Sequence, residues 1–180
     1  RYLSKATYAP RMPLSKTARI LLVLFVLVVN VGCDRATKSM ARAAIAENER
    51  IALCHDHLTL MRMENTGAFL SLGAGLSGTA RGWVFAILPL LFLGGGVGWL
   101  LTRQRMAASV IWGMGCVVGG GIGNVIDRLM YGSVTDFLYL RFGMLHTGVF
   151  NAADMSIMTG VVILLVYAWR GTSSATYGRG

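Results

Sequence analysis

Residues 106–126, MAASVIWGMGCVVGGGIGNVI, run for 21 positions without a charged side chain. An α-helix rises about 1.5 Å per residue, so this segment spans roughly 31 Å, close to the thickness of the hydrocarbon core of a bilayer. The stretch 82–102, GWVFAILPLLFLGGGVGWLLT, has the same length and also lacks charge. Both segments therefore predict transmembrane helices.

Two further apolar segments lie nearer the ends of the chain. The first, 20–33, is short, so its helix must continue past Asp34 to Lys38, with the polar groups facing protein or the headgroup layer. Asn30, Asp34 and Lys38 recur at every fourth position and would share one helix face. The last segment follows Asp154. We expect four transmembrane helices at about 18–42, 82–102, 106–127 and 151–170.

The composition agrees with a membrane setting. Hydrophobic residues make up 54% of the chain, charged residues only 14%, and mean hydropathy is +0.58. Soluble domains typically carry about 25% charged residues. Nine basic residues in three acid-free segments account for the whole net charge of +9: Arg1, Lys5, Arg11, Lys16, Arg19, Arg103, Arg105, Arg170 and Arg179.

This charge asymmetry predicts the orientation of the chain. Because cytoplasmic segments of membrane proteins carry the excess of Lys and Arg, we expect both termini in the cytoplasm. Segments 46–80 and 129–148 would then be extracytoplasmic. The high pI of 10.1 reflects topology on this interpretation, and nucleic acid is not expected as a partner.

The predicted architecture is a single integral membrane domain over 1–180, membrane all-α, with a basic cytoplasmic tail at 1–17. Each external segment contains a strand-like alternation, at 58–63 and at 134–140. We therefore expect a small extracytoplasmic β-sheet or cradle, accompanied by a short surface helix or loop.

A different interpretation of the N-terminal region is a cleaved lipoprotein signal peptide, because a basic stretch and a short apolar run precede Cys33. Asn30 is a poor match to the apolar residue expected three positions before such a cysteine. Three more spans also follow. We therefore favour a first helix that is retained.

The glycines suggest close packing, and neither the cysteines nor the histidines suggest a metal site. Gly115, Gly119 and Gly123 recur every four residues, a spacing that favours close helix packing over a phosphate-binding loop. The three cysteines and three histidines have no metal-ligand spacing. We assign no metal and no cofactor.

Three carboxylates stand out in this apolar chain: Asp127 and Asp154 lie at the ends of apolar segments, and Asp136 interrupts a strand-like run. An ionisable group at membrane depth is costly unless something requires it. Asn151 precedes Asp154 with the spacing of a helix N-cap and an acid at N3, which gives both a structural explanation. For Asp136 the structural explanation is an ion pair with Arg128 or Arg141.

Four motifs, in this order and spacing, resemble the lipoprotein signal peptidases (signal peptidase II of bacteria) over about residues 18–170. They are DRATK at 34–38, ENTGAF at 64–69, GNVIDR at 123–128 with GSVTDF at 132–137, and FNAAD at 150–154. The resemblance implies a membrane aspartic endopeptidase that cleaves the signal peptide from diacylglyceryl-modified prolipoproteins, N-terminal to the lipidated cysteine. It implies a monomer among membrane lipids in the bacterial cytoplasmic (inner) membrane, with its active site at the extracytoplasmic face.

The catalytic positions of that family fall on Asp136 and Asp154. Two nearby carboxylates resist being ionised together, so one can hold a proton while the other activates water. The residues leave open which aspartate is the base. The resemblance also implies substrate-binding and supporting positions at Asn65, Gly67, Asn124, Arg128, Asn151, Asp34, Lys38 and Asp127.

Other classes of protein remain to be weighed. A multi-pass transporter or ion-relay protein could use the same acids, although the chain shows no obvious internal repeat. A lipid-processing transferase would need acids clustered around a divalent metal, whereas these three are separated by 9 and 18 positions. Metal dependence would distinguish it from a peptidase. Intramembrane aspartyl proteases of another type carry a Gly-x-Gly-Asp stretch, which this chain lacks.

Overall fold

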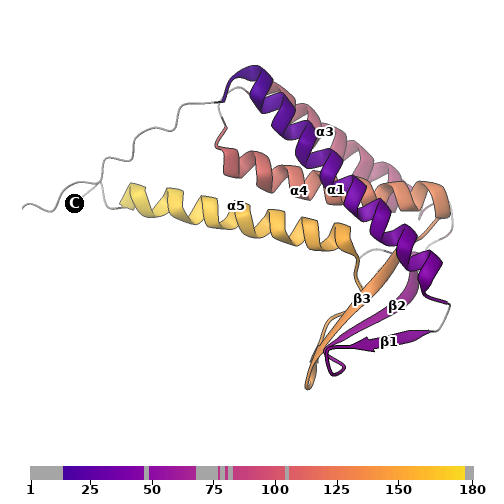
Figure 1. The fold of residues 1–180 in the computed structure, drawn as a ribbon. Coiled ribbons are helices and arrows are strands. Elements are labelled where there is room, and N and C mark those ends of the chain that lie inside the picture. The colour runs from indigo at the N-terminus through magenta and orange to yellow at the C-terminus, as the bar shows by residue number, and fades with distance from the viewer. Residues whose placement is uncertain are drawn as a thin grey trace, which may run out of the picture.

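A computed structural model describes residues 14–46, 49–67, 77, 80, 83–103 and 106–176. Within this part of the chain, four helices are long and apolar enough to cross a membrane, as predicted. They are α1 (Lys16–Ala44), η2 (Trp83–Ile87) continued by α3 (Leu88–Thr102), α4 (Ala108–Tyr131) and α5 (Ala152–Thr176). Figure 1 shows them as a bundle. The expected short surface helix or loop falls largely on residues outside the described ranges.

Local chemistry sets several helix ends. The Ser15 hydroxyl accepts a hydrogen bond from the Ala18 backbone N–H at 3.2 Å and caps the start of α1. α4 ends at Gly132, whose positive φ of 73° is the left-handed conformation that glycine adopts without steric cost. The chain turns there directly into a strand.

The bundle packs around α4, which contacts the other three helices. Glycines on α4 allow a close approach to α1, because a Cβ at Gly115 would lie 2.7 Å from the Val26 side chain. One at Gly119 would lie 2.7 Å from Asn30 Cβ, and one at Gly123 would collide with the Asp34 carboxylate. The predicted packing role of these glycines is confirmed.

One sheet accompanies the helices in the described part of the chain. Its four strands pair antiparallel in the order β1-β2-β3-β4. They are β1 (Arg50–Leu53), β2 (Leu58–Asn65), β3 (Val134–Phe142) and β4 (Leu145–His146). The predicted strands at 58–63 and 134–140 correspond to β2 and β3. Nothing in the sequence pattern indicated β1 or β4, both of which are short edge strands.

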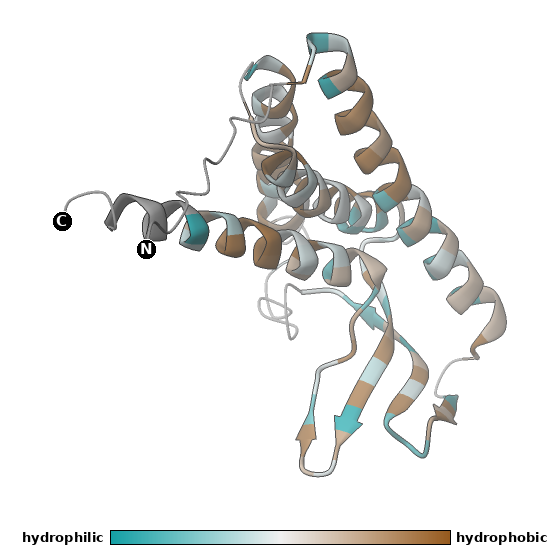
Figure 2. Ribbon diagram, turned by 60° about the vertical axis from the view of Figure 1, so that its left-hand side comes forward, coloured by the Kyte–Doolittle hydropathy of each residue, from teal (hydrophilic) through white to brown (hydrophobic). Residues whose placement is uncertain are grey.

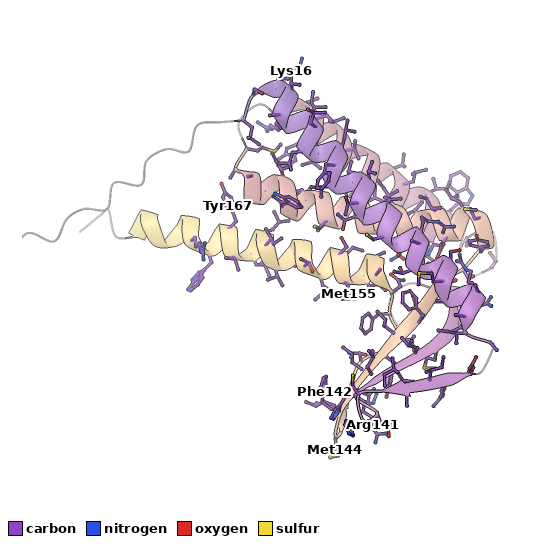
Figure 3. All side chains as sticks on the ribbon, in the orientation of Figure 1. Lys16, Arg141, Phe142, Met144, Met155 and Tyr167 are labelled. Atoms are coloured by element: carbon purple, nitrogen blue, oxygen red, sulfur yellow. The ribbon has the colours of Figure 1, made fainter. Side chains whose placement is uncertain are left out.

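The sheet lies at one end of the bundle, where α1 ends and α5 begins (Figure 1). Buried Ala41 of α1 and Ile45, the residue that follows α1, pack there against Phe137 of β3. Met144 lies at the tip of the β3–β4 hairpin, whereas Lys16 lies toward the other end of the bundle (Figure 3). Figure 2 shows apolar residues concentrated along the helices, and both apolar and polar residues on the strands.

Candidate active site

Asp136 and Asp154 come from different elements and converge on one residue, Asn151. Asp136 lies near the start of β3, and Asp154 lies in the first turn of α5. Asn151 donates from Nδ2 to Asp136 Oδ1 at 2.7 Å and from its backbone N–H to Asp154 Oδ2 at 3.1 Å. One residue therefore bonds both carboxylates, although they are 18 positions apart in the chain.

The start of α5 has the predicted capping geometry. The Asp154 backbone N–H donates to Asn151 Oδ1 at 3.0 Å, and this bond reciprocates the one from the Asn151 N–H to the Asp154 carboxylate. Reciprocal bonds of this kind form a capping box. The partial positive charge of a helix N-terminus favours a carboxylate there. Asn151 and Asp154 thus form the helix cap and also take part in the arrangement of the two acids.

Two more asparagines complete the hydrogen bonding of the pair. Asn124 Nδ2 on α4 donates to Asp154 Oδ1 at 2.9 Å. Asn65 Nδ2 at the end of β2 donates to Asp136 Oδ2 at 3.2 Å. Each carboxylate consequently has both oxygens bonded to N–H groups, which are neutral donors that orient an acid without neutralising its charge.

Asp136 is the more buried acid, with only 4% of its surface exposed. Burial, together with the charge of Asp154, raises the pKa of Asp136 to about 6, against the hydrogen bonds from Asn151 and Asn65. Among the described residues, no salt bridge to Asp136 within 4.0 Å is formed by Arg128, Arg141 or any other cation. The geometry therefore does not support the ion-pair explanation.

The predicted bracing residues meet behind the pair. Lys38 Nζ lies 2.9 Å from Asp34 Oδ2 and 3.2 Å from Asp127 Oδ2, and all three side chains are fully buried. The same ammonium donates to Asn124 Oδ1 at 2.8 Å, and Asp34 Oδ1 accepts from the Ala153 backbone N–H at 3.0 Å. The buried charges are thus connected to the residues that hold Asp154.

Gly67 and Arg128 lie beside this network. Arg128 donates to the Gly67 carbonyl at 2.9 Å and to the Asn124 carbonyl at 3.3 Å. The Gly67 N–H donates to Asn65 Oδ1 at 3.1 Å, so the same turn orients the amide that reaches Asp136. All the predicted site residues are brought together at this end of the bundle.

Sequence reasoning missed four further residues of the network. Arg35 and Arg42 of α1 both pair with Asp127, the latter at 3.1 Å, while Glu64 and Thr135 link the two central strands. Arg42 continues the four-residue spacing of Asn30, Asp34 and Lys38, and that spacing was a usable signal. Glu64 and Thr135 had no such signal, because strand register is not readable from one sequence.

The arrangement suits acid–base chemistry on a bound group. Two carboxylates in a largely desolvated setting, held by amides, can divide the roles of proton donor and acceptor. Within the described ranges, no group of three or more His, Cys, Asp or Glu side chains is arranged to hold a metal ion.

Comparisons with known proteins identify the class. The family model for signal peptidase (SPase) II matches residues 25–170. The lipoprotein signal peptidase of Hydrogenovibrio crunogenus is 34% identical over 139 residues, which cover 77% of this chain and 80% of the relative. That of Gloeobacter violaceus is 36% identical over 148 residues, covering 81% and 80%.

The fold is also similar to that of solved proteins. A bacterial membrane enzyme determined by the in meso method has a TM-score of 0.71 at 23% identity, covering 88% of this chain and 91% of that chain. A second such structure has a TM-score of 0.68. The family model and the relatives define the class, a peptidase, and the four apolar helices agree with a membrane enzyme. The chain belongs to the signal peptidase II family, whose members are aspartic-type proteases.

Proposed function

We propose that this chain removes the signal peptide from diacylglyceryl-modified prolipoproteins, cutting N-terminal to the lipidated cysteine, with Asp136 and Asp154 as its catalytic pair. The observation that carries the proposal is that Asn151 donates one hydrogen bond to each of the two carboxylates. The names of the relatives from Hydrogenovibrio and Gloeobacter support this class of substrate.

The two acids have different surroundings, which supports different roles. Burial raises the pKa of Asp136 toward about 6, so this carboxyl is the better candidate for holding a proton and donating it in a hydrogen bond to the scissile carbonyl. Asp154 stands at a helix N-terminus, where a charged carboxylate is favoured. We assign Asp154 as the base that takes a proton from water.

The reaction then needs no covalent intermediate. Water attacks the scissile carbonyl carbon as Asp154 removes its proton, while Asp136 hydrogen-bonds the carbonyl oxygen as negative charge develops there. The C–N bond breaks, and the proton held on Asp154 passes to the leaving nitrogen. The products are a carboxylate and a free amine, and the apparent pKa values of the cycle belong to the pair.

We assign binding roles to the polar groups around the pair. Asn65 and Gly67 lie in one turn next to Asp136, and the Arg128 guanidinium donates to the Gly67 carbonyl. We assign this group to the binding of an extended peptide backbone. Asn124 and Asn151 orient the acids. Asp34, Lys38 and Asp127 brace these amides from behind.

The proposed orientation places both termini in the cytoplasm and the site at the extracytoplasmic face of the bacterial cytoplasmic (inner) membrane. Its support is the positive-inside distribution of charge, with Lys16 toward the end of the bundle opposite the sheet (Figure 3). All site residues come from one chain, which supports a functional monomer. A diacylglyceryl group anchors its cysteine at about 0.8 kcal/mol per buried methylene, so the enzyme must work where the lipid lies.

The test is cleavage of a diacylglyceryl-modified prolipoprotein by purified protein. Asp136→Asn and Asp154→Asn should each remain folded by thermal unfolding and lose cleavage by at least about 10³-fold. Asp56→Asn, on the exposed turn between β1 and β2, is the matched control and should cleave normally. Full activity of either folded site variant, or abolition of cleavage by a chelator, would contradict the proposal.

A further inference from the structure

Thr135 and Glu64 flank the site without belonging to it. Thr135 precedes Asp136 on β3, and Glu64 precedes Asn65 on β2. The two residues are directly opposite in the antiparallel pairing, and Met63 is opposite Asp136. Directly paired residues share one face of a sheet, and neighbours in a strand alternate. Asn65 and Asp136 therefore lie on one face, with Glu64 and Thr135 on the reverse.

The pair on the reverse face is strongly hydrogen-bonded. Thr135 is fully buried, and its hydroxyl lies 2.9 Å from Glu64 Oε1 and 3.1 Å from Oε2. Arg42 Nε donates to the same hydroxyl at 2.8 Å, so the Thr135 proton is available to the carboxylate. The Thr135 N–H also donates to Asp127 Oδ2 at 3.2 Å.

Glu64 is held in its ionised form. Burial opposes its charge, but hydrogen bonds from the Ser133 and Thr135 hydroxyls, and then the contacts with Arg62 and Arg42, keep the pKa of Glu64 below its usual range. A charged acceptor makes the bond from Thr135 stronger than a neutral pair would.

The pairing of β2 with β3 is irregular near the site, so a hydrogen bond that fixes their relative position matters there. Leu60 pairs with Leu138 and Met63 with Asp136, so β2 advances three residues while β3 advances two. One extra residue on β2 interrupts the ladder there. Because of this irregularity, pairing in the outer half of the sheet does not by itself set the pairing beside Asp136.

We propose that Thr135 and Glu64 are positioning residues for the peptidase site: their cross-strand hydrogen bond fixes β2 against β3 so that the Asn65 amide reaches Asp136 Oδ2. The inference rests on the proposed role of Asp136. Arg42 connects this cross-strand hydrogen bond to α1, because it donates to Thr135, and Lys38 of the same helix donates to Asn124. Neither residue touches the reacting atoms, and both act through Asn65.

Thr135→Val tests the proposal, because it removes the hydroxyl and keeps a β-branched side chain suited to a strand. A misplaced site group lowers turnover more than binding, so kcat should fall about tenfold while KM changes less than about twofold. Thr135→Ser restores the hydroxyl and should return kcat to within about twofold of the unmodified enzyme.

Thr147→Val is the matched control. The Thr147 hydroxyl also bonds to β3, accepting from the Leu140 backbone N–H at 3.0 Å, but it has no bond to Glu64 or Asn65 among the described contacts, so kcat should stay within about twofold. Thr135→Val with unchanged kcat overturns the proposal, as does Thr135→Ser with the same loss as Thr135→Val. If Thr135→Val fails to fold, Glu64→Gln replaces it, and unchanged kcat in that variant has the same meaning.

A double-mutant cycle shows whether Thr135 acts through Asn65. Adding Thr135→Val to Asn65→Ala should lower kcat by less than about twofold further, and losses that multiply would overturn the proposal. Asp136→Asn is measured in the same assay. Full activity of Asp136→Asn would contradict the proposed function and, with it, the positioning role of Thr135 and Glu64. An inactive Asp136→Asn together with a fully active Thr135→Val would contradict the positioning role alone.

Discussion

The two ends of the helical bundle are stabilised by different interactions. At the end far from the sheet, the core is mostly apolar, with Val23, Leu100 and Ile111 fully buried and Arg19 as the buried charged residue among those described there. At the end near the sheet, the fully buried side chains include Lys38 and Asp127, held by hydrogen bonds and ion pairs. Apolar contacts are non-directional, whereas hydrogen-bonded charges require defined positions. The geometry of the site is therefore imposed by its own polar scaffold.

The largest expected difference between the ends comes from removing one buried charge. Lys38→Met leaves the Asp34 and Asp127 carboxylates without their shared ammonium, and breaking a buried ion pair costs about 3–5 kcal/mol. Ile111→Val at the opposite end removes one methylene and should cost about 0.5–1.5 kcal/mol. Thermal unfolding in detergent compares the two. Equal losses would show that the two ends do not differ.

The second expected effect is a gain in stability rather than a loss, and it depends on pH. Asp136 has its pKa raised from 3.8 to about 6 in the folded protein, so its contribution to stability is present below about pH 4 and is lost as the pH rises through about 6. At pH 7 the charged form costs up to about 3 kcal/mol. Asp136→Asn should therefore raise the unfolding temperature at pH 7, with little gain near pH 4. A gain that does not vary with pH would refute this linkage.

A smaller difference is expected between packed and open glycines. A Cβ at Gly120 would collide with the Ala153 carbonyl and lie 2.9 Å from Ile157, so Gly120→Ala should force α5 away and cost about 1–3 kcal/mol. A Cβ at Gly94 on α3 would meet no atom within 4 Å. Gly94→Ala is the control and should be neutral or stabilising by up to about 1 kcal/mol. Unfolding temperatures that rank the two the other way would contradict the packing.

The smallest expected effect concerns Glu64, whose pKa is shifted in the opposite direction to that of Asp136. Its pKa is lowered in the folded protein, so its contribution is present above its ordinary pKa and is lost as the pH falls through the folded value. Glu64→Gln should lower the unfolding temperature at pH 7 and make less difference in acid. We expect the slopes for Glu64→Gln and Asp136→Asn to have opposite signs. Slopes of the same sign would mean that one assignment is wrong.

Much of this architecture was predictable from the sequence, for identifiable reasons. Charge-free runs predicted the helices because a bilayer core tolerates few exposed charges. The capping pattern at Asn151 and Asp154 was visible because it is local. The spacing of Gly115, Gly119 and Gly123 predicted close packing with α1, which the structure shows.

The contacts across strands and helices were not predictable. That Thr135 faces Glu64 depends on a register shifted by an extra residue in β2. The Asn151 side chain reaches Asp136 only because β3 and α5 are brought together through the bridge between Leu138 and Phe150. Such distant contacts follow from the folded arrangement rather than from local spacing, so the resemblance to a family, and not the residues alone, singled out Asp136.

The central claim is that Asp136 and Asp154 act as one unit, and a double variant tests it most directly. The measurement is kcat on a diacylglyceryl-modified prolipoprotein for Asp136→Asn, Asp154→Asn and the combination of both. Groups that act together are strongly non-additive, so the double variant should be about as slow as either single one. Losses that multiply in the double variant would show independent roles and contradict the catalytic pair.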